Sequence, residues 1–279
     1  MKYLTRLLRT SCVLSSLLLL IPVLATPAGA GELLSHRASY LLSLGHSQSG
    51  SDVVDVQGVM VYEFADACDG WTTSQKARIE FFYNDGRTSQ VGWSLSSWEA
   101  KNGKHYRFFM RNLDGDTVTS AFKGEAEIPA AGQAGVVRFE QPSGKTLTLP
   151  RGTLFPTAHT LALLRHLGAG DITFLATVFD GSDDKGSIQI SAALASRGQP
   201  AAEDSKISPL LAGGPVYRLS LAFFAPAGEV GSGDESTPEQ EQAVSIYANG
   251  VIDRLTMDYG SFTVDAALKK LEALPASGC

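Results

Sequence analysis

Hydrophobic and polar residues alternate along much of the chain after residue 35. The residues that share one face of segment 36–44 are His36, Ala38, Tyr40, Leu42 and Leu44. Segment 53–64 repeats the pattern, and one side of it holds Val54, Val56, Met60, Tyr62 and Phe64. A period of two over this length is typical of a half-buried β-strand.

Short glycine-containing turns separate such segments. Asn84-Asp85-Gly86 follows segment 71–83, and Asp-Gly or Asn-Gly between strands is a strong hairpin signal. The pair recurs at Asn102-Gly103, Asp114-Gly115, Asp180-Gly181 and Asn249-Gly250. The other strand-like segments are 87–99, 105–113, 116–128, 135–141, 145–149, 172–179, 187–194, 216–225, 242–247 and 251–259. The pattern therefore predicts a mainly β protein with an antiparallel sheet of twelve or more strands.

One interior segment, 157–167, has helical periodicity. Ala158, Leu161 and Leu164 form its apolar stripe, which Leu163 and Leu167 widen. Thr157 is expected to cap the start, and the glycines at 168 and 170 are expected to end the helix. This short amphipathic helix either packs in the core against the sheet or lines a groove for an apolar ligand. In the second case the candidate ligand contacts are Phe155, Leu161 and Leu164.

The remaining segments are less regular. In the tail 264–274, Val264, Leu268 and Leu271 have helical spacing, and both a strand and a helix stay open there. Segments 197–209 and 226–238 are rich in Gly, Pro, Ser and Glu and are predicted to be surface loops. Because neither is long enough for a clear linker, residues 31–279 are expected to form a single domain.

The first thirty residues have the features of a secretory signal peptide. Lys2, Arg6 and Arg9 precede an apolar run over residues 12–25, and Ala28-Gly29-Ala30 is a small-residue cleavage site. We expect cleavage after Ala30; an uncleaved anchor helix is the alternative. No other stretch of 18 apolar residues follows, so the mature chain is expected to be exported and soluble, without a transmembrane span.

Composition and charge narrow the function. The chain is 44% hydrophobic and 19% charged, which is typical of a folded globular protein. Removing residues 1–30 takes away three positive charges and no negative ones, so the net charge changes from −6 to −9. The longest basic run is Lys269-Lys270, and nucleic-acid binding is therefore not expected.

Two cysteines remain in the mature chain, Cys68 and the last residue, Cys279. In an oxidising compartment, one disulfide between the C-terminus and an early segment is the simplest interpretation. Two free thiols are the alternative. A metal site is disfavoured because the pair lacks partner ligands at metal spacing.

No motif in the sequence indicates catalysis or a cofactor. There is no G-x-S-x-G nucleophile elbow, H-x-x-x-H pair, phosphate-binding glycine loop or Walker motif. His159 and His166 lie seven residues apart, and a core or capping role is favoured over a metal site. Segment 180–186 lacks the ligand pattern of a calcium loop and is expected to be a turn. We therefore expect no metal, no cofactor and no catalytic residues.

Several segments, in this order, resemble a family of exported cell-envelope integrity proteins, the EipB family. They are His36-Arg-Ala-Ser-Tyr40, Gly58-Val-Met-Val-Tyr-Glu-Phe64, Cys68-Asp-Gly-Trp71, Ser96-Ser-Trp98-Glu99, the run from Leu149 to His159, Phe179-Asp-Gly181, Asp258-Tyr-Gly-Ser-Phe262 and Ser277-Gly278-Cys279. Together they extend over essentially the whole mature chain.

This resemblance implies a periplasmic protein folded as a β-spiral, with a disulfide between Cys68 and Cys279. It implies a role in envelope integrity without enzymatic activity. The spiral is similar to half-barrel lipoprotein carriers, which suggests an apolar cargo, such as a lipid or a lipoprotein, or a peptide partner. A periplasmic tetratricopeptide-repeat protein is the implied protein partner. The alternative is an exported hydrolase acting on envelope material, for which a serine and an acid would have to meet at His159.

Overall fold

The structure is a computed structural model that describes residues 33–225, 237–275 and 277–279. Its strands form one antiparallel sheet, which confirms the predicted fold class. The predicted signal peptide and its cleavage site after Ala30 lie outside the described residues, as does most of the predicted loop 226–238. The strands are β1 (His36–Ser47), β2 (Val53–Asp66), β3 (Gly70–Tyr83), β4 (Thr88–Ala100), β5 (His105–Asp114), β6 (Thr117–Glu127), β7 (Gly135–Gln141), β8 (Thr146–Leu149), β9 (Thr173–Val178), β10 (Ile188–Gly198), β11 (Val216–Phe224), β12 (Gln240–Tyr247), β13 (Ile252–Asp258) and β14 (Phe262–Ala273).

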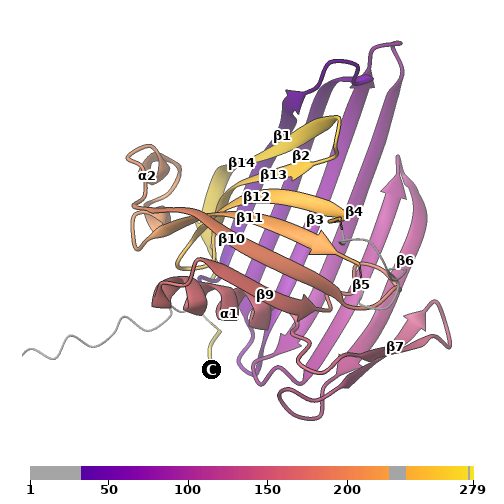
Figure 1. Cartoon of the computed structure of the whole chain (residues 1–279), viewed down its shortest axis with the longest axis vertical. Coiled ribbons are helices and arrows are strands. Elements are labelled where there is room, and N and C mark those ends of the chain that lie inside the picture. Colours follow the sequence, from indigo (N-terminus) through magenta and orange to yellow (C-terminus); the bar gives the residue numbers. More distant parts are fainter. Residues whose placement is uncertain (1–32, 226–236, 276) are drawn as a thin grey trace, which may run out of the picture.

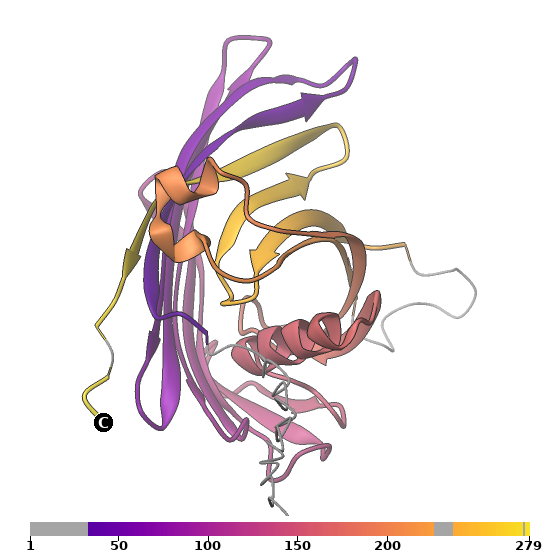
Figure 2. The same cartoon turned by 90° about the vertical axis from the view of Figure 1, so that its left-hand side faces the viewer.

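The strand order is β8-β7-β6-β5-β4-β3-β2-β1-β14-β13-β12-β11-β10-β9. Two meanders of neighbouring strands are thus joined where the first described strand, β1, pairs with the last, β14. The long strands β1–β6 form one curved wall, and β9–β14 curl across in front of it (Figures 1 and 2). The sheet therefore curls around an interior and stays open.

The free edges of the sheet are strands β8 and β9. After β8 the chain forms a parallel bridge from Leu154 to Val178 of β9. The Leu154 N–H donates to the carbonyl oxygen of Thr177 (2.9 Å), and the Phe179 N–H donates to that of Leu154 (3.0 Å). These bonds satisfy part of the backbone of β9 and protect the edge from further strand pairing.

Helix α1 (Pro156–Ala169) lies at the lower end of the sheet, between the two walls (Figure 2). It confirms the predicted helix and ends at Gly170, whose φ of 104° is left-handed. Its buried residues are Thr157, His159, Leu163, Leu164 and Leu167. The buried face is therefore centred on Leu163, Leu164 and Leu167, whereas Ala158 and Leu161 of the predicted stripe are only half-buried.

The tail is strand β14, which excludes the helical alternative for residues 264–274. Val264, Ala266, Leu268 and Leu271 are buried in it. In the pairing of β1 with β14, Ser39 lies opposite Lys270, but the next residue, Tyr40, lies opposite Leu268. Lys269 is therefore an extra residue in β14, that is, a β-bulge. Because the bulge moves the alternation by one residue, the inward side chains imitate helical spacing.

Two further predictions are corrected by the structure. The register also shifts at the start of β2, where Val53 is buried while Val54, predicted to face inward, is 54% exposed. The predicted loop 197–209 contains the short helix α2 (Asp204–Ile207) and leads into a 3-10 helix at Pro209–Leu211. Leu211 is fully buried in the hydrophobic core that β1–β3 share with β14, which anchors the segment on the domain.

Candidate ligand-binding cavity

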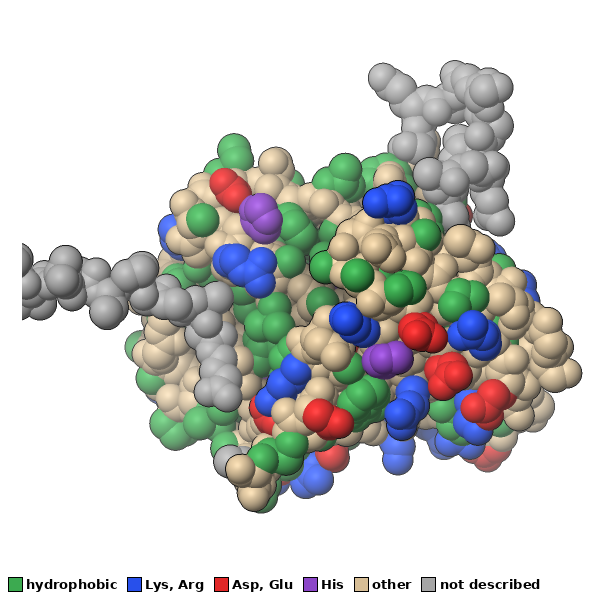
Figure 3. All heavy atoms as spheres, turned by 90° about the horizontal axis from the view of Figure 1, so that it is seen from below, with side chains coloured by type: hydrophobic (Ala, Val, Ile, Leu, Met, Phe, Trp, Pro, Cys, Tyr) green, Lys and Arg blue, Asp and Glu red, His purple; other side chains and the backbone are tan. Residues whose placement is uncertain are grey.

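A cavity of about 340 Å³ lies between the two walls of the sheet, beside the first turn of α1. It is bordered by the inner faces of β1–β5, by α1 and by the β12–β13 hairpin. Most of its wall is apolar, and the larger apolar side chains include Leu34, Met60, Phe64, Leu95, Ile252 and Leu255. Seen from below, hydrophobic side chains lie in a recess that charged side chains border (Figure 3).

Strand alternation explains why these side chains meet. Across β2, β3 and β4 the inward residues form rows, one of which joins Tyr62, Gln75 and Leu95. The next row joins Phe64, Thr73 and Ser97. Inward positions deeper in the same wall hold Ala77 and Ile79, both buried. The sheet thus changes from a closed apolar core to a cavity wall with uncharged polar groups at its lower end.

Two tyrosines brace the cavity by hydrogen bonds to the backbone. The Tyr40 hydroxyl donates to the carbonyl oxygen of Ile252 (2.7 Å), linking β1 to the β12–β13 hairpin. The Tyr106 hydroxyl donates to the carbonyl oxygen of Asp180 (2.8 Å). A third phenol, Tyr62, has its pKa raised to about 12 by burial. All three side chains therefore present neutral hydroxyl groups at physiological pH.

His36 is buried at the start of β1. Its Nδ1 lies 2.6 Å from the carbonyl oxygen of Leu34, so this nitrogen carries the proton of the neutral ring. Burial lowers the pKa of His36, and the hydrogen bond to Leu34 opposes that effect only in part. His36 therefore contributes a neutral imidazole, not a cation, to the cavity wall.

Glu99 at the end of β4 is 2% exposed and holds the start of α1. Its Oε2 accepts the N–H of Thr157 (2.7 Å) and its Oε1 accepts the N–H of Ala158 (2.8 Å). Phe155, the residue before the helix, makes no side-chain cap, and the predicted cap Thr157 lies inside the first turn. A carboxylate from a distant strand therefore caps this helix. Burial raises the pKa of Glu99, and the two backbone N–H groups oppose that rise.

The three predicted ligand contacts lie beside the cavity and do not line it. Phe155 is fully buried and stacks on Tyr106, with ring centroids 5.2 Å apart. Leu164 is buried against β10–β12, and Leu161 is half-buried. Ligand contact by these residues stays a prediction. The helix residues that do line the cavity are Pro156, Thr157 and Thr160.

Three polar residues that line the cavity were not predicted from the sequence, although their positions in the strands give a weak signal. Gln75, Thr73 and Ser97 are polar residues at inward positions of strands whose other inward residues are mostly apolar. An uncharged polar group on an otherwise apolar strand face indicates that this face borders a solvent-accessible cavity there. The alternation alone does not show that these positions come together, because that depends on the register of three strands.

The histidine needed by the hydrolase alternative is in apolar surroundings. His159 is buried, and its Nε2 has no hydrogen-bond partner within the described residues. Its ring lies 5.7 Å from that of Phe174, and burial lowers its pKa to about 4. His166 is exposed and pairs instead with Asp171 (2.6 Å). The described part of the chain therefore offers no serine and acid in hydrogen-bonding contact with His159.

The described residues also contain no group of three or more His, Cys, Asp or Glu side chains close enough for a metal ion. In segment 180–186 the carboxylates bind the turn itself: Asp180 accepts the N–H of Ser182 and Asp183 that of Lys185. Asp184 pairs with Lys145. Among the helices that the structure describes, none combines the length and apolar character needed to cross a bilayer.

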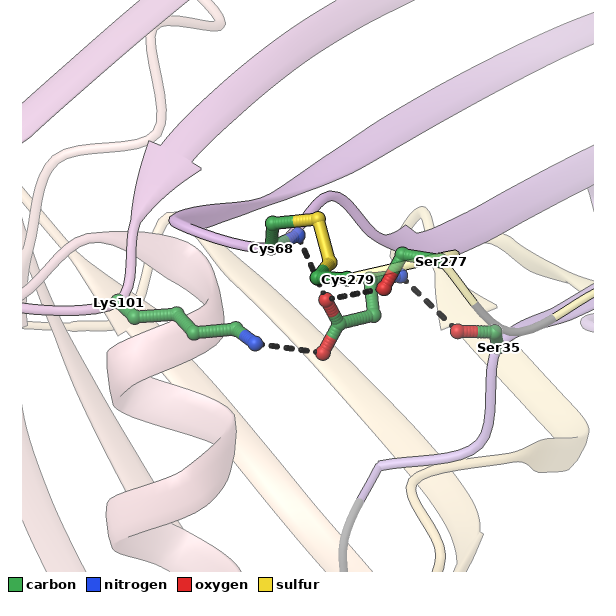
Figure 4. The surroundings of a disulfide bond; sticks show 6 residues. Ser35, Cys68, Lys101, Ser277 and Cys279 are labelled. Atoms are coloured by element: carbon green, nitrogen blue, oxygen red, sulfur yellow. Dashed lines mark hydrogen bonds and ion pairs between the residues drawn. A yellow bond between two sulfur atoms is a disulfide. The ribbon is translucent and has the colours of Figure 1, made fainter.

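The predicted disulfide joins Cys68 to Cys279, with Cα atoms 5.9 Å apart (Figure 4). Asp66 organises its surroundings: its carboxylate accepts the N–H of Cys68 (2.8 Å) and the hydroxyl of Ser277 (3.0 Å). It also pairs with Lys101 (2.6 Å). Lys101, followed by the other hydrogen bonds, holds the pKa of Asp66 below its usual range. The bond ties the C-terminus to the β2–β3 turn, beside the end of β4 that carries Glu99.

Comparison with known proteins agrees with this architecture. The sequence profile of the EipB-like family matches residues 27–275. The cell envelope integrity protein EipB of Brucella abortus (strain 2308) is 28% identical over 250 residues, which cover 89% of this chain and 87% of that protein. A crystal structure of a β-barrel-like protein of the domain of unknown function DUF1849, also from Brucella abortus, superposes with a TM-score of 0.77. It is 26% identical and covers 88% of this chain and 99% of the other.

Proposed function

Because the chain belongs to the EipB-like family, we propose that it supports cell-envelope integrity by holding an apolar or amphipathic ligand in its cavity. The name of the Brucella abortus relative supports the role in the envelope. The signal-peptide pattern in residues 1–30 supports export to the periplasm. In this proposal the protein binds and does not catalyse.

One observation carries the proposal: a cavity of about 340 Å³ with a mostly apolar wall lies between walls that the fold holds apart. A sheet that curled only to bury its core would be expected to fill this space, because protein interiors are packed as densely as organic crystals. The cavity instead carries half-buried leucines beside a few hydroxyl and amide groups, a composition typical of small-molecule sites. Hydrogen bonds fix the positions of the elements around the cavity: Glu99 holds the start of α1, Tyr40 bonds to Ile252, and Tyr106 bonds to Asp180.

A pair of variants on β4 tests the proposal. Ser97 faces the cavity, and its neighbour Ser96 is exposed on the opposite face of the same strand. Ser97→Trp is expected to fill the cavity and to abolish the fluorescence gain of N-phenyl-1-naphthylamine on binding, whereas Ser96→Trp is expected to retain it. Melting curves are recorded to check that both variants fold.

The same variants then test the role in cells that lack the gene. Ser96→Trp is expected to restore resistance to detergent, and Ser97→Trp is expected not to restore it. Full rescue by a folded Ser97→Trp protein that no longer binds the dye would contradict the link between the cavity and the envelope.

A further inference from the structure

The part of the cavity wall that the structure describes carries no positive side chain. Among the described residues that line it, none is Lys or Arg, and the buried His36 has a lowered pKa. The ionisable acid in the wall is Asp180, whose Oδ1 accepts the N–H of Ser182. A ligand anion placed here would be desolvated without a counter-ion and would lie near a carboxyl group, and both effects are unfavourable.

The start of α1 would otherwise be the natural place for an anion in this cavity. Helix N-termini present free backbone N–H groups and a partial positive charge. Here Thr157, which lines the cavity, and Ala158 already donate their N–H groups to the carboxylate of Glu99. The buried carboxylate of Glu99 thus occupies the position at the start of α1 where a ligand anion would otherwise bind.

The other polar groups of the wall are uncharged. They include the hydroxyls of Tyr40, Tyr62, Thr73, Ser97, Tyr106, Thr157 and Thr160 and the amides of Gln75 and Asn249. Resting on the function proposed above, we infer that the cavity selects an amphiphile with an uncharged, hydrogen-bonding head group and rejects anionic amphiphiles such as fatty acids. Hydroxyl and amide head groups find both donors and acceptors here, while a carboxylate finds no cation.

Two probes with the same acyl chain test this inference. Mono-oleoylglycerol and oleate, each below its aggregation concentration at pH 7.5, are titrated against the protein carrying N-phenyl-1-naphthylamine. Mono-oleoylglycerol is expected to displace the dye at least about tenfold more tightly than oleate, a difference of about 1.4 kcal/mol. Equal or tighter binding of oleate overturns the inference and leaves the proposed function standing. If neither the lipids nor the dye bind, the proposed function fails, and the inference fails with it.

Two variants identify the cause of the discrimination. Glu99→Gln keeps one acceptor for the helix N–H groups but removes the charge, and Asp180→Asn keeps an acceptor for Ser182. Each variant is expected to reduce the difference in affinity between mono-oleoylglycerol and oleate, mainly because oleate binds more tightly. The exposed Glu125→Gln on β6 is the matched control and is expected to leave this difference unchanged. If Glu99→Gln does not fold, Asp180→Asn decides the question; an unchanged difference in every folded variant contradicts the assigned cause.

Discussion

Protonation of His159 gives a pH-dependent stability that can be worked out from the structure. Burial lowers the pKa of this histidine from 6.5 to about 4, and its Nε2 has no partner within the described residues. As the pH falls below 6.5, the unfolded chain binds the proton while the folded chain does not. The free energy of unfolding therefore decreases until the pH passes the folded pKa, below which both states are protonated. Between pH 7.5 and 4.5 this amounts to about 2–3 kcal/mol.

Comparison with His159→Leu isolates this contribution. Leucine has no titrating group and suits the apolar surroundings formed by Phe174 and the helix. His36, whose pKa is also lowered, titrates in both proteins and cancels. Urea unfolding with the disulfide intact, at pH 7.5 and 4.5, is expected to show that the unmodified protein loses about 2–3 kcal/mol more of its unfolding free energy than the variant. Parallel losses in the two proteins would refute the assignment of a buried, neutral His159.

Three other predictions concern stability. Changing Cys68 or Cys279 to Ser is expected to cost about 2–5 kcal/mol and lower the melting temperature, since the bond closes a loop between residues 211 apart; full thiol labelling of the untreated, denatured native protein would contradict the bond. Leu164→Asp places an unpaired carboxylate in the core and is expected to lower the free energy of unfolding by several kcal/mol. Arg165→Asp, on the exposed face of α1, is the control and is expected to cost little. Equal melting temperatures of the two variants would show that Leu164 and the apolar stripe of α1 are exposed. Glu99→Ala leaves two N–H groups of α1 without their acceptor and is expected to cost about 2 kcal/mol in urea unfolding, and a midpoint equal to that of the unmodified protein would rule out the cap.

The strands could be predicted from the sequence because alternation and glycine turns are local signals. Every predicted strand segment overlaps a strand of the sheet, and the helix begins and ends within two residues of its expected limits. The tail was ambiguous for a physical reason. The bulge at Lys269 interrupts the period of two, so that the inward residues Leu268 and Leu271 are three residues apart, as on one face of a helix. The same effect at the start of β2 placed Val54 on the wrong face.

The cavity could not be predicted in the same way, because it depends on contacts between distant segments. Glu99 and Thr157 are 58 residues apart, and Tyr40 and Ile252 are 212 apart. The apolar stripe of the helix left open whether Leu161 and Leu164 pack in the core or meet a ligand. In the structure the helix turns Leu164 into the core and presents Thr157 and Thr160 to the cavity. The direction of a helix face relative to a curved sheet is set by packing, which a single amphipathic pattern does not contain.

The most direct test of the central claim is native mass spectrometry of protein isolated from its own periplasm, without detergent. We expect an uncharged amphiphile bound to the unmodified protein and to Ser96→Trp, and none bound to Ser97→Trp. An unmodified protein that arrives empty, or a Ser97→Trp protein that carries the same molecule, would contradict it.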